Sequence, residues 1–271
     1  MPNTTFSSNN LQIEVINDPG VWGSLISRAK EGSIYLSVGW GAYKERQGWS
    51  VRRLAVGSAL AQVQTKNATL FGPAITLIQG GPVFSEGANQ DTMEATLAAL
   101  LASGGGHGMA VQVIQPGSAI SPQLELLLAK QEFRVAPTED SDTFSLNLTK
   151  SDDELREALS KNWRHNLKRA ENRGLEVRWI NTDPVARRQA VGRLAKLYDA
   201  LTRRKSFASA LDPVALGACF HGDANLDMLE VVLNGNVLAS RAVYHGGHTT
   251  LDLLAASSEG ARNTYANYLA V

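Results

Sequence analysis

Between residues 159 and 179 the chain reads LSKNWRHNLKRAENRGLEVRW, with six Lys and Arg residues against two Glu residues. The whole chain has 26 basic and 26 acidic residues and a formal net charge of zero, so positive charge is concentrated in this stretch. Such a local field attracts anions, among them phosphates, nucleotides and RNA. The alternative is a solvated helix with a basic outer face, and charge alone does not separate the two.

An amphipathic helix is the local structure that we expect here. Ser151 and Glu154 have the spacing of a capping box, in which each side chain satisfies a backbone N–H group at the helix start. One helix should run from this box to Gly174, because glycine commonly ends helices. Apolar residues recur on one face and basic residues on another. The apolar face comprises Leu155, Leu159, Trp163, Leu167 and Ala170, and the basic face comprises Lys161, Arg164, Lys168 and Arg169.

The composition sets the class of protein. The chain has 271 residues, of which 44% are hydrophobic and 19% are charged, as in globular proteins of one large domain or two ordinary ones. Cys219 is the single cysteine, so no intramolecular disulfide is possible, which fits a reducing cytoplasm. We expect residues 1–10 to be a loose tail rather than a signal peptide, and no apolar run is long enough to span a membrane. The sequence therefore favours a cytoplasmic protein.

Strand and helix patterns alternate along the chain and repeat in kind. Two strands at 59–79 lead into a helix near Asn89, and two strands at 237–257 lead into a final helix from Ala261. In the first half a strand, a helix and two further strands follow (FRVAP and TFSLNL), but the second half has no counterpart of them. The prediction is an α/β chain of two domains, residues 1–149 and 150–271. The second domain is expected to lack its C-terminal strands, as in a fragment of a longer protein.

Three segments in order resemble the Fem-type (FemABX) peptidoglycan aminoacyltransferases. They are WGAYKERQGW, the junction R-x-x-L-x-x-A-x-x-x-G-L-E-V inside residues 164–177, and YDALTRRKSF followed by VLASRAVYHGGHTTLDLLAASSEGARNTYANYL. The resemblance implies two tandem GNAT-like domains, that is, domains of the acyl-CoA N-acyltransferase fold. It also implies a cell-wall enzyme that moves an amino acid from aminoacyl-tRNA to an amine on the stem peptide of a peptidoglycan precursor.

The same resemblance implies binding roles for individual residues. Lys44 and Arg204 match positions that contact the diphosphate of a UDP-linked or lipid-linked muropeptide precursor, and guanidinium groups bind phosphate oxygens bidentately. Trp40 would form a wall of this site. The basic face of Lys161, Arg164, Lys168 and Arg169 would contact the tRNA backbone. Each role has a plainer alternative: an exposed lysine, cations favoured by a helix C-terminus, a core tryptophan and a solvated face.

No catalytic residue can be named from the sequence, so positioning and oxyanion stabilisation would carry the reaction. No cofactor, metal or DNA partner is expected. The pair His245 and His248 is better explained by a glycine turn, and Cys219 and His221 point in different directions on a helix.

Two other functions stay open. The turn in SSEGARNTYA is a degenerate version of a CoA pyrophosphate site, so an acyl-CoA-dependent N-acyltransferase of envelope or polysaccharide biosynthesis is one alternative. A non-catalytic nucleotide-binding or RNA-binding relative is the other. A shared fold does not choose among them, because one fold hosts many chemistries.

Overall fold

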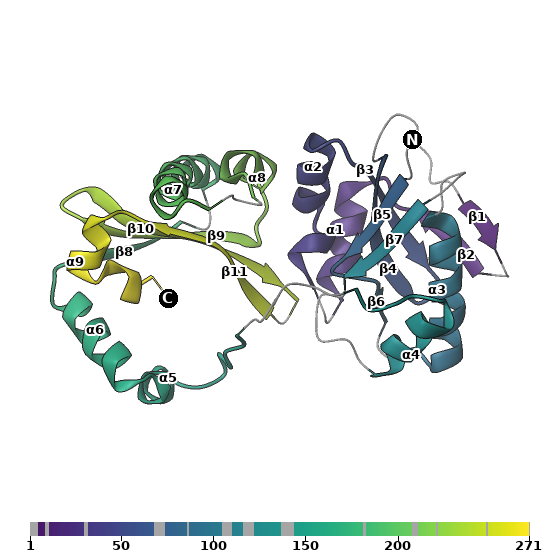
Figure 1. The fold of residues 1–271 in the computed structure, drawn as a ribbon, viewed down its shortest axis with the longest axis horizontal. Coiled ribbons are helices and arrows are strands. Elements are labelled where there is room, and N and C mark those ends of the chain that lie inside the picture. The colour runs from purple at the N-terminus through teal and green to yellow at the C-terminus, as the bar shows by residue number, and fades with distance from the viewer. Residues whose placement is uncertain are drawn as a thin grey trace. The chain divides into compact units, whose positions relative to one another are not determined.

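The chain forms a mixed α/β structure with two sheets, seen in a computed structural model (Figure 1). The structure describes residues 5–8, 11–29, 32–67, 74–85, 87–104, 110–115, 122–136, 144–180, 183–207, 211–220, 222–247 and 249–270. It divides into two compact units. Unit 1 comprises residues 1–133, 218–225 and 244–251, and unit 2 comprises residues 134–217, 226–243 and 252–271. The two-domain boundary at residue 149 stays a prediction.

The sheet of unit 1 has the strand order β1-β2-β3-β4-β5-β7, and β6 pairs with β4. Neighbouring strands are antiparallel except β5 and β7, which are parallel. The prediction of a loose N-terminal tail is wrong for Thr5–Ser8, because these residues pair with β2. The strands are β1 (Thr5–Ser8), β2 (Leu11–Val15), β3 (Ser50–Val56), β4 (Ala59–Asn67), β5 (Ala74–Gln79), β6 (Val83–Phe84) and β7 (Ala110–Gln115).

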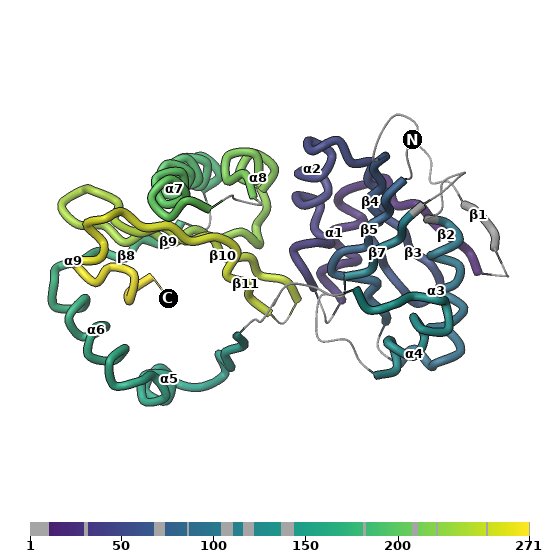
Figure 2. The backbone as a smooth tube through the Cα atoms, viewed as in Figure 1, coloured from purple at the N-terminus to yellow at the C-terminus, as the bar shows by residue number. Residues whose placement is uncertain are grey.

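Helices cover this sheet on both faces (Figures 1 and 2). Successive strand residues point to opposite faces, so Leu54 and Val63 pack against Leu100 of α3 (Gln90–Gly104). Ala55 and Leu60 point to the other face, where they pack against a cluster that includes Trp22 and Ile26 of α1 (Pro19–Ser27). The remaining helices of unit 1 are the 3₁₀ turn η1 (Ile34–Leu36), α2 (Val38–Arg46) and α4 (Pro122–Lys130).

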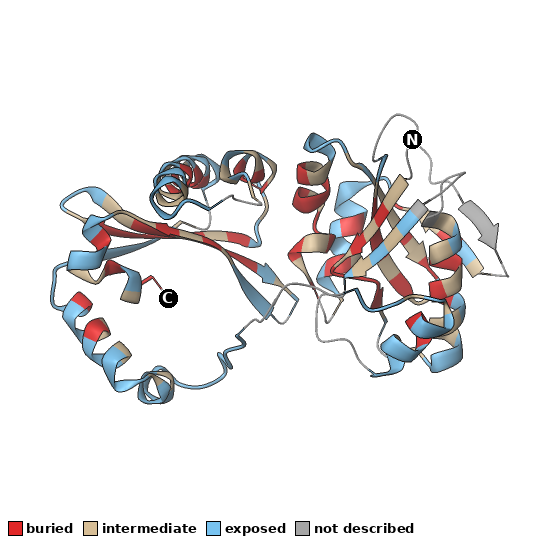
Figure 3. Cartoon of the chain, viewed as in Figure 1, coloured by how far each residue is buried: buried red, intermediate tan, exposed pale blue. Residues whose placement is uncertain are grey.

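The sheet of unit 2 has the strand order β11-β10-β9-β8, and the long helix α7 (Pro184–Lys205) lies on one face of it (Figure 1). α7 buries a stripe that includes Ala190 and Leu194, and Figure 3 shows this inner face in red. The opposite face carries α9 (Gly260–Thr264) and η2 (Ala266–Tyr268), whose alanines complete a core with the sheet. The other elements are β8 (Glu176–Ile180), β9 (Leu226–Leu233), β10 (Asn236–Gly246), β11 (Thr249–Ser257) and α8 (Pro213–Phe220).

The helix predicted from Ser151 to Gly174 is two helices, α5 (Asp152–Ala158) and α6 (Lys161–Glu171). The capping box at Ser151 and Glu154 is confirmed, with both hydrogen bonds present. Ser160 causes the break: its Oγ accepts a hydrogen bond from Trp163 N at 3.3 Å, and Leu159 is extended. A serine that caps a new helix competes with continuation of the old one.

Three other predictions of local structure are corrected. FRVAP and TFSLNL, predicted as strands, are irregular over the described residues 133–136 and 144–148. Alternation alone does not make a strand, since a strand needs a hydrogen-bonded neighbour, and Phe144 is fully exposed. The final helix is interrupted, because Tyr265 takes a left-handed conformation (φ +60°) between α9 and η2.

Within the described part of the chain, no helix has both the length and the apolar character to cross a membrane.

Candidate functional site

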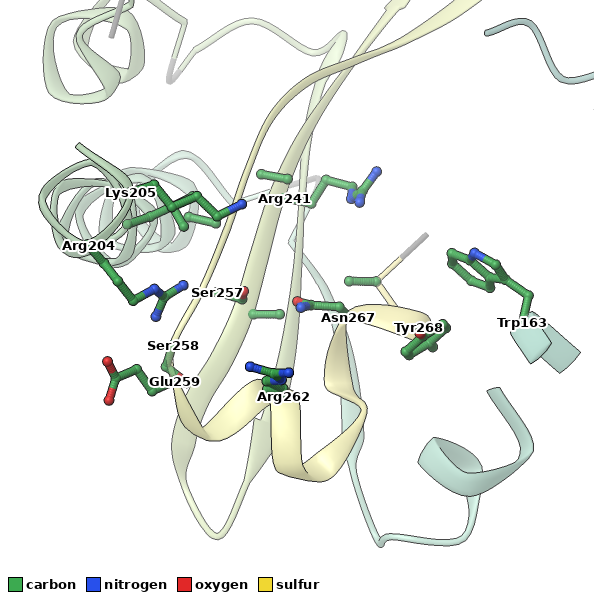
Figure 4. A pocket seen from close by; sticks show the side chains of 15 residues that line it. Trp163, Arg204, Lys205, Arg241, Ser257, Ser258, Glu259, Arg262, Asn267 and Tyr268 are labelled. Carbon is green, nitrogen blue, oxygen red and sulfur yellow. The ribbon is translucent and has the colours of Figure 1, made fainter. Parts of the chain in front are cut away.

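A cavity of about 780 Å³ opens in unit 2, where the end of α7 meets the ends of β10 and β11 (Figure 4). Its volume lies in the range of small-molecule sites. Four cations and one carboxylate line it, together with an aromatic pair. These residues are Arg204, Lys205, Arg241, Arg262, Glu259, Trp163 and Tyr268.

The last turn of α7 positions the first two cations. Asp183 caps the start of this helix by accepting from Val185 N at 2.8 Å, and Ser206 ends it in a left-handed conformation. The helix dipole favours positive charge at this end. Arg203 pairs with Asp199 at 2.6 Å, whereas Arg204 and Lys205 line the cavity. The structure thus distinguishes Arg204 from its neighbour.

Strand β10 contributes a third cation, Arg241. Arg241 of β10 forms an ion pair with Asp252 of β11. Its Nε and the Oγ of Ser258 are buried and have no hydrogen-bond partner among the described residues. Buried polar atoms are normally paired, so an unpaired donor at a cavity wall is a candidate ligand contact.

The aromatic side of the cavity joins α6 to η2. Trp163 and Tyr268 form an edge-to-face pair with ring centroids 4.6 Å apart, and Figure 4 shows them facing each other. Asn166 Nδ2 donates to the Tyr268 hydroxyl at 2.9 Å. Arg169 donates to the hydroxyl of Tyr265, the residue with the left-handed backbone, at 2.8 Å. Four positive groups beside an aromatic pair can bind a ligand that combines phosphate groups with a planar ring.

The basic face of α6 divides into two kinds of residue. Arg164 donates to the carbonyl oxygens of Glu157 and Leu159 at 2.5 and 2.8 Å, so it ties α6 to α5. Arg169 is held by Tyr265, as described above. All four residues are exposed, but Lys161 and Lys168 form no such side-chain hydrogen bond within the described part of the chain. An RNA-binding role stays a prediction for all four, and the exposed lysines are the better placed for it.

Lys44 and Trp40 lie in unit 1, on α2. The Lys44 Nζ lies 5.4 Å from the ring centroid of Trp40 and 5.2 Å from that of Trp49, within cation–π range. The Lys66 Nζ lies 5.8 Å from the ring centroid of Trp49, so this ring is close to both lysines. Trp40 itself is buried and donates to Gln79 Oε1 at 3.1 Å. Burial, and then the like charge of Lys66, lower the pKa of Lys44. We call Trp40, Lys44, Trp49 and Lys66 the lysine–tryptophan cluster.

Cys219 and His245 were the other polar residues considered as catalytic or metal-binding candidates. Burial raises the pKa of the Cys219 thiol, which is the reverse of an activated nucleophile. His245 Nδ1 lies 2.9 Å from Thr250 Oγ1. His221 and His248 lie outside the described residues.

Sequence reasoning named part of this cavity, namely Arg204 and the turn SSEGARNTYA, which it read as a degenerate CoA pyrophosphate site. Arg204 was predicted as a substrate contact, but Lys205, Arg241 and Tyr268 were not. Arg241 had one available signal, because it is a lone charge inside the apolar strand pattern VLASRAVYH. Nothing local marks Tyr268, which lines the cavity from η2.

The fold is similar to that of several solved structures. The crystal structure of FemX matches with a TM-score of 0.78 and 16% sequence identity, over 93% of this chain and 82% of FemX. A conserved protein of unknown function from Bacteroides thetaiotaomicron VPI-5482 matches with a TM-score of 0.60 and 13% identity, over 94% of this chain and 83% of that one.

A third match is the C-terminal domain (DUF2156) of a putative lysylphosphatidylglycerol synthetase from Agrobacterium fabrum. Its TM-score is 0.55 and its identity 14%, over 93% of this chain and 72% of that one. No protein-family sequence model matches the chain, and no curated protein sequence matches it. The class defined by these likenesses is a mixed α/β fold with two sheets that resembles FemX.

Proposed function

We propose that the chain is an aminoacyltransferase that moves an amino acid from aminoacyl-tRNA to the stem-peptide amine of a peptidoglycan precursor. The observation that carries this proposal is the cavity of unit 2, which four cations and an aromatic pair line together on a FemX-like fold. The 3′ end of a charged tRNA presents phosphates and a terminal adenine, which match those two features. The tandem GNAT-like organisation implied by the sequence belongs to this proposal.

The proposed reaction joins an amine to an activated ester. The neutral acceptor amine attacks the ester carbonyl carbon, an amide bond forms, and the ester bond to the tRNA breaks. The proton lost by the amine goes to the departing 3′-oxygen. Arg204, which the sequence resemblance assigns to the precursor's diphosphate, would here hold the donor's phosphates together with Lys205 and Arg262, because all three line the same cavity. Their contribution is positioning. No general base is assigned.

The lysine–tryptophan cluster would hold the other substrate. Two ammonium groups beside the Trp49 ring offer charge for a diphosphate and an aromatic surface for a sugar or base. Lys44 and Trp40 therefore keep the precursor-binding role that the sequence resemblance implies. Lys161 and Lys168 keep the proposed tRNA-backbone role.

The test is a transfer assay with UDP-N-acetylmuramoyl-pentapeptide and a mixture of charged tRNAs, with the product mass as readout. Wild-type protein should add one aminoacyl group to the precursor. Arg204→Ala should lower the rate about tenfold or more, since a charge-assisted phosphate contact is lost. Arg203→Ala is the matched control, because Arg203 pairs with Asp199, and it should keep most of the rate. Loss of activity in both variants would argue against the cavity as the donor site.

An acyl-CoA donor is the second candidate, because the same cations and the turn at Ser257–Glu259 line the cavity. Replacing the charged tRNAs by acetyl-CoA in the same assay separates the two. Acetylated product would establish the acyl-CoA reaction and overturn the tRNA proposal. Tight binding of either donor without product would indicate a non-catalytic binding protein.

A further inference from the structure

A second cavity in unit 2, of about 480 Å³, adjoins the cavity described above. The two cavities share Arg262, Asn267 and Tyr268, which Figure 4 shows together on α9 and η2. Beyond these shared residues the second cavity continues to Tyr265, so we call it the Tyr265 cavity. The proposed transfer reaction assigns no role to Tyr265.

A row of aromatic rings leads from one cavity to the other. The ring centroids of Trp163 and Tyr268 lie 4.6 Å apart, and those of Tyr268 and Tyr265 lie 6.2 Å apart. All three side chains are partly exposed, so each keeps surface that a ligand can contact. We call Trp163, Tyr268 and Tyr265 the aromatic row. It joins the two cavities along one surface of unit 2.

Two arginines lie beside the last ring of the row. The Cζ atoms of Arg169 and Arg173 lie 5.4 and 5.7 Å from the Tyr265 ring centroid, within cation–π range. Arg169 also donates to the Tyr265 hydroxyl at 2.8 Å, which holds this ring in place. Arg173 is exposed, and among the described residues its guanidinium forms no ion pair. A ring and a guanidinium plane are thus both presented beside positive charge.

This combination distinguishes an unpaired strand from other anions. Unpaired bases stack on aromatic side chains and on guanidinium planes, and arginine also neutralises the phosphates between them. A double helix presents its phosphates but encloses the faces of its bases, so it would leave the aromatic row without a partner. A simple phosphate would need the cations alone. The aromatic row beside arginines therefore favours a strand with exposed bases.

We propose that the aromatic row binds two consecutive unpaired nucleotides of an RNA strand. One base lies beside Trp163 and Tyr268 in the first cavity, and the neighbouring base stacks on Tyr265 or on the guanidinium plane of Arg173. Arg262 lines both cavities and so can hold the phosphate that joins the two nucleotides.

The direction of the strand rests on the proposed function. The nucleotide that carries the aminoacyl ester is the 3′-terminal one, and it must occupy the first cavity, where the transfer is proposed to take place. Its 5′ neighbour then occupies the Tyr265 cavity. The inference deepens the proposed function, because it names residues that bind the donor beyond its terminal nucleotide, and it can be tested without any transfer.

The first experiment compares AMP with the dinucleotide CpA at one ionic strength, by calorimetric titration of the whole chain. Both ligands contain adenosine with a 5′-phosphate, and CpA adds one cytidine. CpA should bind about tenfold more tightly or more, because a second base adds a stacking contact. Equal affinities for AMP and CpA would overturn the proposal, since only one nucleotide would then be bound. Absence of binding by CpA would overturn it as well.

A pair of RNA hairpins tests the preference for unpaired bases. One hairpin ends in an unpaired 3′-CCA tail, and the other has the same stem with a blunt end. The tailed hairpin should bind about tenfold more tightly or more, because its tail alone offers free base faces to the aromatic row. Equal binding of the two hairpins would show that the surface recognises phosphate charge, and the proposal would fail.

Two variants locate the second nucleotide. Tyr265→Asn removes the ring and suits the left-handed backbone, since asparagine tolerates this conformation. It should lower the affinity for CpA about tenfold, to near that for AMP, and leave the affinity for AMP unchanged. Arg173→Gln should weaken CpA binding about threefold or more. Arg188→Gln, an equal change of charge at an exposed position of α7, is the matched control and should behave as wild type.

The arginine pair keeps the test decisive if Tyr265→Asn does not fold. Equal losses of CpA affinity in Arg173→Gln and Arg188→Gln would overturn the proposal, because the effect would then be one of overall charge. The outcome is also separate from that of the transfer assay. Tight CpA binding that depends on Arg173 would stand even if no product forms, whereas transfer without a preference for CpA over AMP would remove this inference alone.

Discussion

Lys44 differs from an ordinary surface lysine in what surrounds its ammonium group. Two indole rings lie beside it and a second ammonium lies near one of them, and its pKa is lowered. A lysine with a lowered pKa loses its proton at a lower pH than an exposed lysine does. Its attraction for phosphate is therefore present below that pKa and is lost as the pH rises through it.

Lys44→Arg should change the pH dependence of precursor binding. The wild-type affinity for UDP-N-acetylmuramoyl-pentapeptide should fall as the pH rises from neutral towards about 10, whereas the variant should keep its affinity, because arginine stays charged. Calorimetric titration across this range measures the difference. Lys150→Arg, at an exposed position in unit 2, is the control. Parallel profiles for wild type and Lys44→Arg would show that Lys44 does not bind the phosphates.

At the scale of elements, the backbone at Gly246, the last residue of β10, lies so close to the backbone of Gly32 that neither position has room for a Cβ. Gly246→Ala should lower the free energy of unfolding by about 1–3 kcal/mol, because the new Cβ meets a backbone oxygen that cannot rotate away. A urea titration followed by tryptophan fluorescence would measure it. Gly23→Ala on α1 is the control: its Cβ meets nothing within 4 Å, so a neutral or slightly stabilising effect is expected. Equal midpoints for the two variants would contradict the packing argument.

A few side-chain contacts join the helical pair α5 and α6 to the C-terminal turn of unit 2. Most of its residues are exposed, and it is joined to η2 by Trp163 on Tyr268, Asn166 on Tyr268 and Arg169 on Tyr265. Local stability follows the number of such contacts. This helical pair should therefore open before the sheet does.

Tyr268→Ala should release α6 while the sheet of unit 2 stays folded. Amide hydrogen exchange over residues 161–171 should become faster, about tenfold or more, while β9 keeps its protection. Tyr268→Phe should give a smaller change, since it removes the hydrogen bond from Asn166 and keeps the ring pair. Faster exchange throughout β9 in Tyr268→Ala would mean instead that η2 supports the whole core.

At the scale of the whole molecule, stability should decline in alkaline solution. The pKa of Tyr244 is raised from 10.0 to about 12 in the folded state, and burial also raises the pKa of Tyr35. Above pH 10 the unfolded chain releases protons that the folded chain keeps, so the free energy of unfolding falls between pH about 10 and 12. Tyr244 alone should contribute a loss of the order of 2 kcal/mol across this interval.

Tyr244→Phe tests this decline. The variant loses hydrogen bonds at every pH, so the slope of stability against pH is compared and not its absolute value. The slope should be shallower in the variant, with the remainder due in part to Tyr35. Urea midpoints from pH 8 upward would measure it, and an unchanged slope would contradict the assignment.

Much of the fold was predictable because local patterns and packing agree. The strands β4, β10 and β11 and the capping box at Ser151 fall where the sequence analysis places them. Ser160 is an exception, because its capping hydrogen bond competes with a helix that the apolar stripe would otherwise extend. TFSLNL is another, because alternation predicts which way side chains point and does not supply a neighbouring strand.

The candidate site was predictable only in part. Arg204 carries a local signal, since three cations end a helix, but the choice between Arg203 and Arg204 depends on Asp199. Arg241, Arg262 and Tyr268 meet around one cavity through tertiary structure, and their spacing along the chain contains no periodicity. A cavity of about 510 Å³ in unit 1 is less predictable still, because its walls combine α1, α2, α8 and β10 with the loops between them, and glycines allow their close approach.

The exposed segment Phe144–Leu148 bears on how the protein behaves in concentrated solution. Phe144, Leu146 and Leu148 alternate with polar residues and are 100%, 66% and 63% exposed. On β8, Val177 and Trp179 are exposed in the same alternation. Short apolar segments with strand-like alternation can pair between molecules, and charged residues placed among them discourage it. Storage at high concentration therefore calls for attention to turbidity and light scattering, and a lysine at position 146 is the simplest way to improve colloidal behaviour.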